Sequence, residues 1–114
     1  MMQEPSLNVE EALEWIRQKT EEIPYHKVYF TLRMMKVKSI TKQTIETMRT
    51  ILSLHEYNIP ITTNIIESLT GKNRIAMLHT LGDKELLILK REDRRILEWI
   101  VNPIFLKYYH EGET

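Results

Sequence analysis

Residues 60–101 read PITTNIIESLTGKNRIAMLHTLGDKELLILKREDRRILEWIV, and the spacing of their apolar residues changes partway along. Up to Leu81 the apolar residues recur every three or four positions, which is typical of helices. After Leu86 two apolar runs flank the polar stretch Lys90–Arg95 and predict a β-hairpin. Gly71 separates the two helical patterns and suits the positive φ of a tight turn. We therefore expect a helix from Thr62 or Thr63, a turn over 70–73, a helix over about 73–84 and a hairpin.

Two longer helices are expected before this stretch. The first covers 8–23, where Asn8 is a suitable cap and Pro24 ends the helix. The second covers 41–57 and has Thr41 as its cap. Both carry apolar residues at three- and four-residue spacing, which predicts one buried face on each helix.

Three shorter segments connect and close these elements. Residues 25–38 fit both a strand and a helix, and their propensities favour the helix. Residues 59–61 are too short and too close to Pro60 for a central strand, so a short edge strand is expected. After the hairpin, Asn102 is expected to cap a short helical tail.

The same spacing predicts which side chains form the core. Trp15 widens the apolar stripe of the first helix, and the methionines are expected to fill gaps between larger side chains. The predicted core residues are Val9, Leu13, Ile16, Ile45, Met48, Ile51, Leu52, Ile65, Ile66, Leu69, Ile75, Leu78 and Leu81, together with Met34, Met35 and Met77.

The order of elements over 41–101 is a helix, a short extended link, a short helix, a glycine-containing turn, a helix and a hairpin. This order resembles the winged helix-turn-helix superfamily, and the alternative is a generic small helical bundle closed by one hairpin. The resemblance is carried by Pro60-Ile61-Thr62, Ile65, Ile66, Leu69, Gly71, Ile75, Leu78, Leu81, Leu86-Leu87 and the basic hairpin Lys90–Arg95. Glu85 stands where the superfamily usually has a glycine before the first strand, which leaves the geometry of that turn open.

The resemblance implies a mainly α-helical fold with one β-hairpin. A winged helix-turn-helix domain would cover 41–102, with an N-terminal helical extension over 1–40 and a short apolar tail over 103–114. A three-helix core of this kind is closed without such flanks, so their apolar faces must cover something else. They cover either the back of their own domain or a second copy of the chain, and we expect a homodimer formed through them.

In this superfamily the second helix of the pair lies in the major groove of double-stranded DNA, so a transcriptional regulator is the expected function. Arginine suits guanine and asparagine suits adenine, whereas lysine and threonine suit phosphate. The basic hairpin would meet the flanking backbone or minor groove. The predicted DNA-binding residues are Thr62, Thr63, Lys72, Asn73, Arg74, Met77, His79, Thr80, Lys90, Arg91, Arg94 and Arg95.

The charge distribution leaves a second function open. The net charge of zero divides into −4 over 1–24, +6 over 25–95 and −2 over 96–114. The basic middle suits an anionic partner, whereas the acidic flanks weaken long-range attraction to DNA. Glu92 and Asp93 also stand beside the bases of the hairpin and can neutralise them. The alternative is a winged-helix subunit that binds protein in a replication or transcription assembly and does not contact DNA.

The sequence contains no pattern typical of catalysis or metal binding. The absence of cysteine excludes disulfides, thiolate ligands and a thiol nucleophile. The four histidines lack the spacing of metal ligands. Residues 69–73 resemble the end of a Walker loop but lack its first glycine and preceding strand. We therefore expect no enzymatic activity, no cofactor and no metal.

Composition indicates the class of protein and its environment. The 114 residues are enough for one domain with a core, and 42% hydrophobic with 28% charged residues is typical of globular proteins. No apolar run is long enough to span a membrane and the acidic N-terminus lacks a signal core, so a cytoplasmic location is expected. Fourteen isoleucines, abundant Lys, Arg and Glu, and no cysteine suit a thermophile, and an archaeal or viral source is expected.

Overall fold

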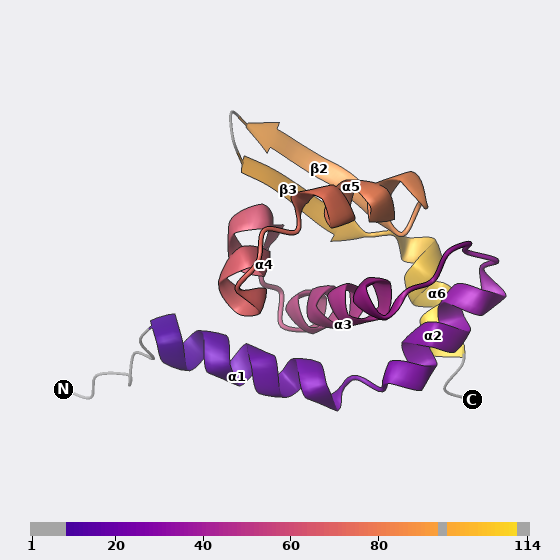
Figure 1. Ribbon diagram of the computed structural model, residues 1–114, viewed down its shortest axis with the longest axis horizontal. Coiled ribbons are helices and arrows are strands. Elements are labelled where there is room, and N and C mark those ends of the chain that lie inside the picture. The colour runs from indigo at the N-terminus through magenta and orange to yellow at the C-terminus, as the bar shows by residue number, and fades with distance from the viewer. Residues whose placement is uncertain (1–8, 94–95, 112–114) are drawn as a thin grey trace.

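The computed structural model describes residues 9–93 and 96–111. Over these residues the chain is mainly helical and carries a small three-stranded antiparallel sheet (Figure 1). The helices are α1 (Val9–Glu22), α2 (Tyr25–Met34), α3 (Lys42–Glu56), α4 (Thr63–Thr70), α5 (Ile75–Asp83) and α6 (Pro103–Glu111). The strands are β1 (Ile61–Thr62), β2 (Leu87–Asp93) and β3 (Ile96–Val101). No helix in the described ranges is long and apolar enough to cross a bilayer.

Local capping determines where the central helices begin and end. The hydroxyl of Thr41 accepts a hydrogen bond from the backbone N–H of Thr44 at 3.1 Å and caps α3. The hydroxyl of Thr62 accepts one from the N–H of Ile65 at 3.2 Å and caps α4. Gly71 ends α4 with a φ of 75°, a left-handed conformation that glycine adopts without steric cost. These three predictions from the sequence are confirmed.

The two segments beside the core are helical. The segment 25–38, which fits both a helix and a strand by its pattern, forms α2 over its first ten residues. In the tail, the side chain of Asn102 accepts a hydrogen bond from the N–H of Ile104 at 2.9 Å and caps α6, as expected. Asn8, the expected cap of α1, lies outside the described residues.

The sheet has the strand order β1-β3-β2, so β3 is its centre. β1 pairs with β3 through Ile61 opposite Trp99. The short edge strand expected at 59–61 therefore exists, but it begins at Ile61 and includes Thr62. Because β1 leads directly into α4, the sheet fixes the start of that helix.

The first strand of the hairpin runs beyond its apolar residues. The run LLILKRE over 86–92 is β-like by sequence, and β2 continues through Lys90–Asp93, within the polar stretch expected to hold the turn. The pairing shifts from Leu89 opposite Trp99 to Arg91 opposite Glu98, so Lys90 is the extra residue of a β-bulge. The bulge allows the strand to continue into polar sequence, which periodicity cannot reveal. Arg94 and Arg95 lie outside the described residues.

α3 is the centre of the fold. Nine of its fifteen residues are buried, because α1, α2, α4, α5 and the sheet all pack around it (Figure 1). The two flanks complete this core: α1 packs on α3 and α4, and α2 packs on α3 and α6. The buried faces of the flanks therefore cover their own domain, while Trp15 on α1 and Phe30 and Met34 on α2 stay exposed. A homodimer stays a prediction.

Four predicted core residues are exposed. They are Val9, Trp15, Met34 and Ile75. Val9, Met34 and Ile75 are terminal residues of their helices, where fewer neighbouring elements surround a side chain. Trp15 instead lies at the edge of the α1–α3 contact, with its ring 4.5 Å from that of Tyr57. Of the other predicted positions, Leu13, Met35, Ile65 and Met77 are half-buried and the rest are buried.

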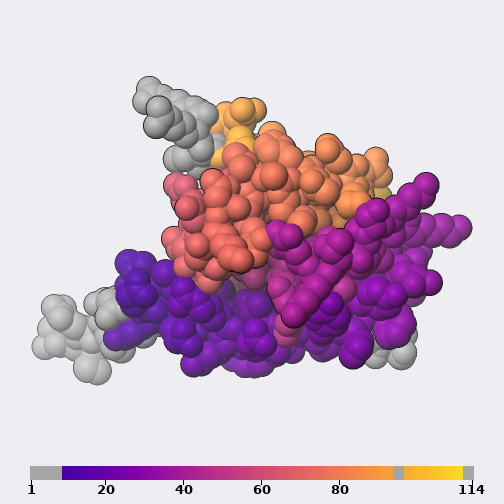
Figure 2. Space-filling view, in the orientation of Figure 1, coloured from indigo at the N-terminus to yellow at the C-terminus, as the bar shows by residue number. Residues whose placement is uncertain are grey.

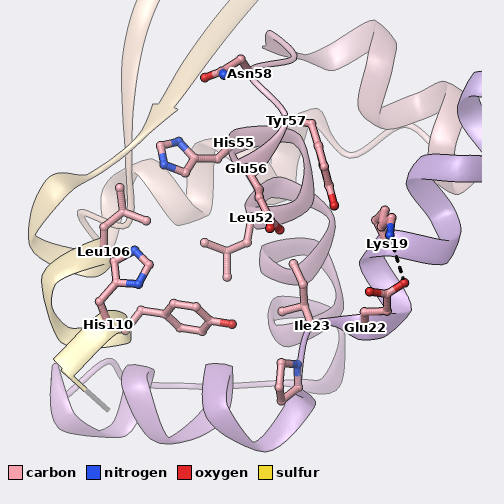
Figure 3. Close-up of a pocket in the computed structure, with 12 residues that line it drawn as sticks. Lys19, Glu22, Ile23, Leu52, His55, Glu56, Tyr57, Asn58, Leu106 and His110 are labelled. Atoms are coloured by element: carbon pink, nitrogen blue, oxygen red, sulfur yellow. Dashed lines mark ion pairs between the residues drawn. The ribbon is translucent and has the colours of Figure 1, made fainter. Parts of the chain in front are cut away.

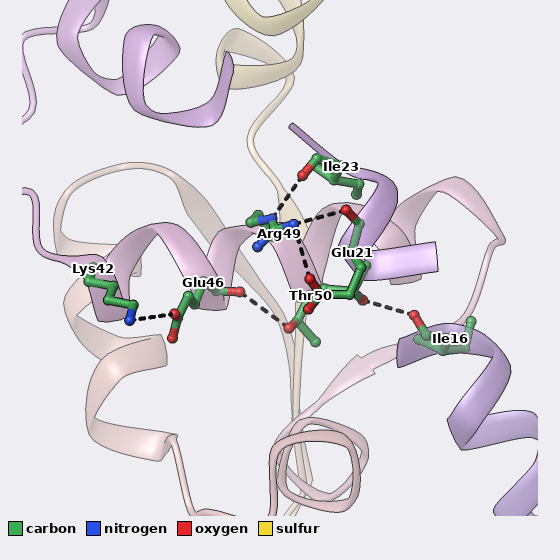
Figure 4. A network of polar contacts seen from close by, with 8 residues as sticks. Ile16, Glu21, Ile23, Lys42, Glu46, Arg49 and Thr50 are labelled. Carbon is green, nitrogen blue, oxygen red and sulfur yellow. Dashed lines mark hydrogen bonds and ion pairs between the residues drawn. The ribbon is translucent and has the colours of Figure 1, made fainter. Parts of the chain in front are cut away.

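An arginine of α3 holds the C-terminal end of α1. Arg49 donates hydrogen bonds from Nε to the carbonyl of Ile23 at 2.8 Å and from Nη2 to the carbonyl of Glu21 at 3.0 Å (Figure 4). The last carbonyls of a helix lack intrahelical partners and carry partial negative charge, which a cation satisfies. Arg49 therefore ties α1 to the central helix.

An arginine of α1 makes the equivalent contact with α4. Arg17 donates from Nε to the carbonyl of Leu69 at 3.0 Å and from Nη2 to the carbonyl of Ser68 at 2.9 Å. Both acceptors lie in the last turn of α4, just before the turn that leads to α5. The N-terminal extension thus stabilises the helix pair α4–α5 directly.

Replacing Arg49 tests this arrangement. Because its side chain is only 14% exposed and makes two charge-assisted hydrogen bonds, Arg49→Ala should lower the free energy of unfolding by about 2–3 kcal/mol. Lys42→Ala on the same helix is the control: that side chain is 79% exposed, and its loss should change stability by less than about 0.5 kcal/mol. Urea unfolding followed by circular dichroism measures both. Equal losses in the two variants would contradict the role given to Arg49.

Candidate nucleic-acid interface

The turn before α5 determines where this helix begins. The side chain of Asn73 accepts a hydrogen bond from the N–H of Ile75 at 2.9 Å, so Asn73 satisfies one of the free donors of the first turn. α5 consequently starts at Ile75, two residues later than predicted. Leu78 and Leu81 are fully buried, as predicted, and this determines which face of α5 is exposed.

Trp99 of β3 sets the distance between α5 and the sheet. A Cβ atom at Gly82 would lie 3.0 Å from Cζ3 of Trp99, so the helix approaches the indole as closely as a glycine allows. The ring of His79 meets the same indole edge-on, with centroids 5.2 Å apart. The indole Nε1 is buried and has no hydrogen-bond partner among the described residues. α5 and the hairpin are therefore held in one fixed relative orientation.

The exposed face of α5 carries no positive charge of its own. Between Ile75 and Asp83 the sequence contains neither lysine nor arginine. The hydroxyl of Thr80 donates to the carbonyl of Ala76 at 2.9 Å, so the hydroxyl oxygen can still accept a hydrogen bond from another group. The exposed residues of this helix are Ile75, Ala76, His79, Thr80 and Asp83, and Met77 is half-buried.

The three predicted residues before α5 lie close together but differ in exposure. Lys72 and Asn73 are exposed. Arg74 is half-buried, and its Nε is a buried donor with no hydrogen-bond partner in the described part of the chain. Arg74 lines a polar pocket of about 300 Å³ together with Glu46 and Arg49. Its side chain therefore lies partly against α3.

The two described bases of the hairpin share one carboxylate. Lys90 Nζ lies 3.3 Å from Glu98 Oε2, and Arg91 Nη2 lies 3.4 Å from Glu98 Oε1. The bulge brings both bases beside Glu98, whose side chain is 13% exposed. Neutralisation of the hairpin bases was expected from Glu92 and Asp93, but Glu98 of the opposite strand provides it.

The remaining predicted residues lie elsewhere. Thr62 and Thr63 are half-buried where β1 joins α4, and the hydroxyl of Thr62 already serves as the helix cap. Arg94 and Arg95 belong to the two-residue gap in the description, so their predicted contacts have no structural account. The structure thus groups Lys72, Asn73, Arg74, Met77, His79 and Thr80 along α5 and its approach, and places Lys90 and Arg91 on the hairpin.

Sequence reasoning missed a group of lysines at the C-terminal end of α5. Lys84 donates a hydrogen bond from Nζ to the backbone carbonyl of Lys38 at 2.7 Å, which joins the end of α5 to the loop before α3. Lys36 and Lys38 are exposed on that loop. Figure 2 shows the start of the magenta segment, which holds this loop, beside the salmon surface of α5. The signal for this group in the sequence is the recurrence of lysine at 36, 38 and 42.

Within the described ranges, 9–93 and 96–111, no three His, Asp or Glu side chains are grouped as metal ligands. No protein-family model, curated protein or solved structure matches the chain. The activity of the chain is therefore inferred from its own geometry and charge.

The hydrogen bond from Ile75 to Asn73, just before α5, gives a direct test of how the start of this helix is held. Asn73→Ala removes the acceptor for the N–H of Ile75 and should lower the free energy of unfolding by about 1 kcal/mol. Asn73→Asp keeps an acceptor of the same geometry and should lose less than half of that. Urea titrations of both variants measure the difference. An Asp variant as unstable as the Ala variant would show that the side chain does not act as a cap.

Proposed function

We propose that the chain is a winged-helix protein that binds double-stranded DNA and regulates transcription. In this proposal α5 enters the major groove and the β2–β3 hairpin lies on the flanking backbone. Support comes from the arrangement in Figure 1, where α5 and the hairpin lie together on the opposite side of α3 from α1. α4 and the capped turn then present α5 as the second helix of a helix-turn-helix pair.

The observation that carries the proposal is the position of the lysines. Lys72 precedes α5, and Lys84 with Lys36 and Lys38 lies at its other end. A nine-residue helix is about 14 Å long, and the major groove is about 12 Å wide. Lysines at the two ends of α5 would therefore reach phosphates on both sides of the groove, while the face between them, which has no lysine or arginine, meets the bases.

The polar side chains on and before α5 suit recognition by hydrogen bonds. Asn73, His79 and Thr80 are the exposed polar residues before and on α5 that would read base edges. In this proposal Arg74 also contacts a base. Because its side chain is half-buried, it must move outward to reach one. Lys90 and Arg91 would contact the backbone only weakly, because Glu98 already compensates their charge.

A second candidate function is a winged-helix interaction subunit that binds protein in a replication or transcription assembly. Ile75 is exposed at the start of α5, and Ile88 and Ile100 form an exposed pair across β2 and β3. Exposed apolar groups of this kind suit a protein partner better than a phosphate backbone. The absence of basic residues within α5 favours the same alternative.

We also propose that the protein acts as a homodimer, because two-fold operators are read by two copies of such a helix. Phe30 on α2 and Ile104 on α6 remain more than half exposed. These two helices pack against each other, so this end of the molecule is a suitable contact between copies.

Removing the newly recognised lysines tests the DNA interface. Lys36→Ala combined with Lys38→Ala should weaken binding to all duplexes alike and reduce the slope of log K against log salt by about two. Lys19→Ala combined with Lys107→Ala, on α1 and α6, is the matched control and should leave the slope unchanged. Fluorescence anisotropy with random duplexes at several salt concentrations measures both.

The same titration decides between the two candidate functions. Wild-type protein that shows no salt-dependent binding at low salt would overturn the DNA proposal and leave the protein-binding subunit in its place. Equal loss of slope in the test and control variants would show that the contact is non-specific charge attraction and that α5 does not position it.

A further inference from the structure

A pocket of about 540 Å³ opens where the C-terminal ends of α1 and α3 meet α6 (Figure 3). Its volume is in the range of small-molecule sites, which is about 300–1,000 Å³. None of its lining residues belongs to the proposed DNA interface. A ligand here would be bound by a separate part of the molecule.

The inner wall of the pocket is apolar. Ile23 comes from the end of α1, Leu52 from α3 and Tyr109 from α6, and all three are almost fully buried. Leu106 adds a half-buried apolar side chain from α6. Arg49 holds the backbone on one side of this wall through its hydrogen bond to the carbonyl of Ile23 at 2.8 Å. A ligand must therefore offer an apolar body of its own.

The rim of the pocket carries one uncompensated negative charge. In Figure 3 the side chain of Glu56 points into the pocket, and its carboxylate makes no ion pair or hydrogen bond with the described residues. The lysine in the lining, Lys19, pairs with Glu22 at 3.5 Å and lies 5.5 Å from the ring of Trp15. Lys19 therefore neutralises Glu22 and leaves Glu56 available to a cation.

An aromatic ring stands next to this carboxylate. Tyr57 follows Glu56 in the sequence and lines the same pocket, and its ring is fixed by the edge-on contact with Trp15 at 4.5 Å. The face of an aromatic ring attracts an ammonium group, so ring and carboxylate favour the same charge. An anion would instead be repelled, and a bare inorganic cation would make no use of the apolar wall.

We propose that this pocket binds a small organic cation with an apolar body, an amphiphilic amine. Its ammonium group pairs with Glu56 beside Tyr57, and its apolar part lies on Ile23, Leu52 and Tyr109. The site requires no DNA, so its test is independent of the proposed function.

The probe is 2-phenylethylamine, titrated into the full chain without DNA and followed by isothermal calorimetry. We expect a Kd below about 1 mM, reasonable for a ligand of nine non-hydrogen atoms. Three comparison compounds separate the contributions. 2-Phenylethanol lacks the charge, 3-phenylpropionate reverses it, and ethylamine lacks the apolar body, so each should bind at least about fivefold more weakly.

Two variants locate the site. Glu56→Gln keeps the size of the side chain, and because the carboxylate is exposed it should weaken binding of 2-phenylethylamine by about fivefold. Glu67→Gln, also exposed but on α4, is the control and should leave affinity unchanged. No binding at 10 mM probe, equal binding of 2-phenylethanol, or undiminished binding by Glu56→Gln would each overturn the proposal. Circular dichroism of the variants checks that they remain folded.

Discussion

The hydrogen bonds from Arg49 to the last carbonyls of α1 are the constraint on which the arrangement of the flanks depends. They end α1 against the central helix, at the point where Pro24 turns the chain into α2. α2 then lies along α3 and meets α6, so helices from both flanks join one core. The wall of the large pocket belongs to the same junction. With Arg17 bound to the end of α4, the N-terminal extension becomes part of the domain that holds α5.

The features that could be predicted from the sequence are those that depend on residues close together in the chain. The caps at Thr41 and Asn102 and the left-handed Gly71 depend on a few neighbouring residues and were predicted. For the cap of α4 the sequence left Thr62 or Thr63, and the structure has Thr62. The contacts of Arg17 with α4 and of Arg49 with α1 join residues far apart in the chain and have no local pattern. The same holds for the bulge at Lys90, which depends on the pairing partner, and for the burial of Arg74, which depends on α3.

The candidate interface shows why charge counted along the sequence is a poor guide to a binding surface. The basic middle of the chain contains Lys90 and Arg91, yet both lie beside Glu98 and contribute little free charge. Lys36 and Lys38, from a loop with no recognised motif, lie next to the end of α5 through the bond between Lys84 and the loop. The proposed surface is therefore a helix without lysine or arginine, with Lys72 before its start and Lys36, Lys38 and Lys84 near its end, and such a surface is compatible with a net charge of zero.

The proposal that α5 meets DNA is tested most directly by backbone amide chemical shifts. These are recorded while a random-sequence duplex is added to the ¹⁵N-labelled chain at low salt. The account predicts the largest shifts over residues 72–84 and 36–38, smaller ones in the hairpin, and unchanged signals along α1. Shifts confined to α2 and α6, or none at all with excess duplex, would contradict it.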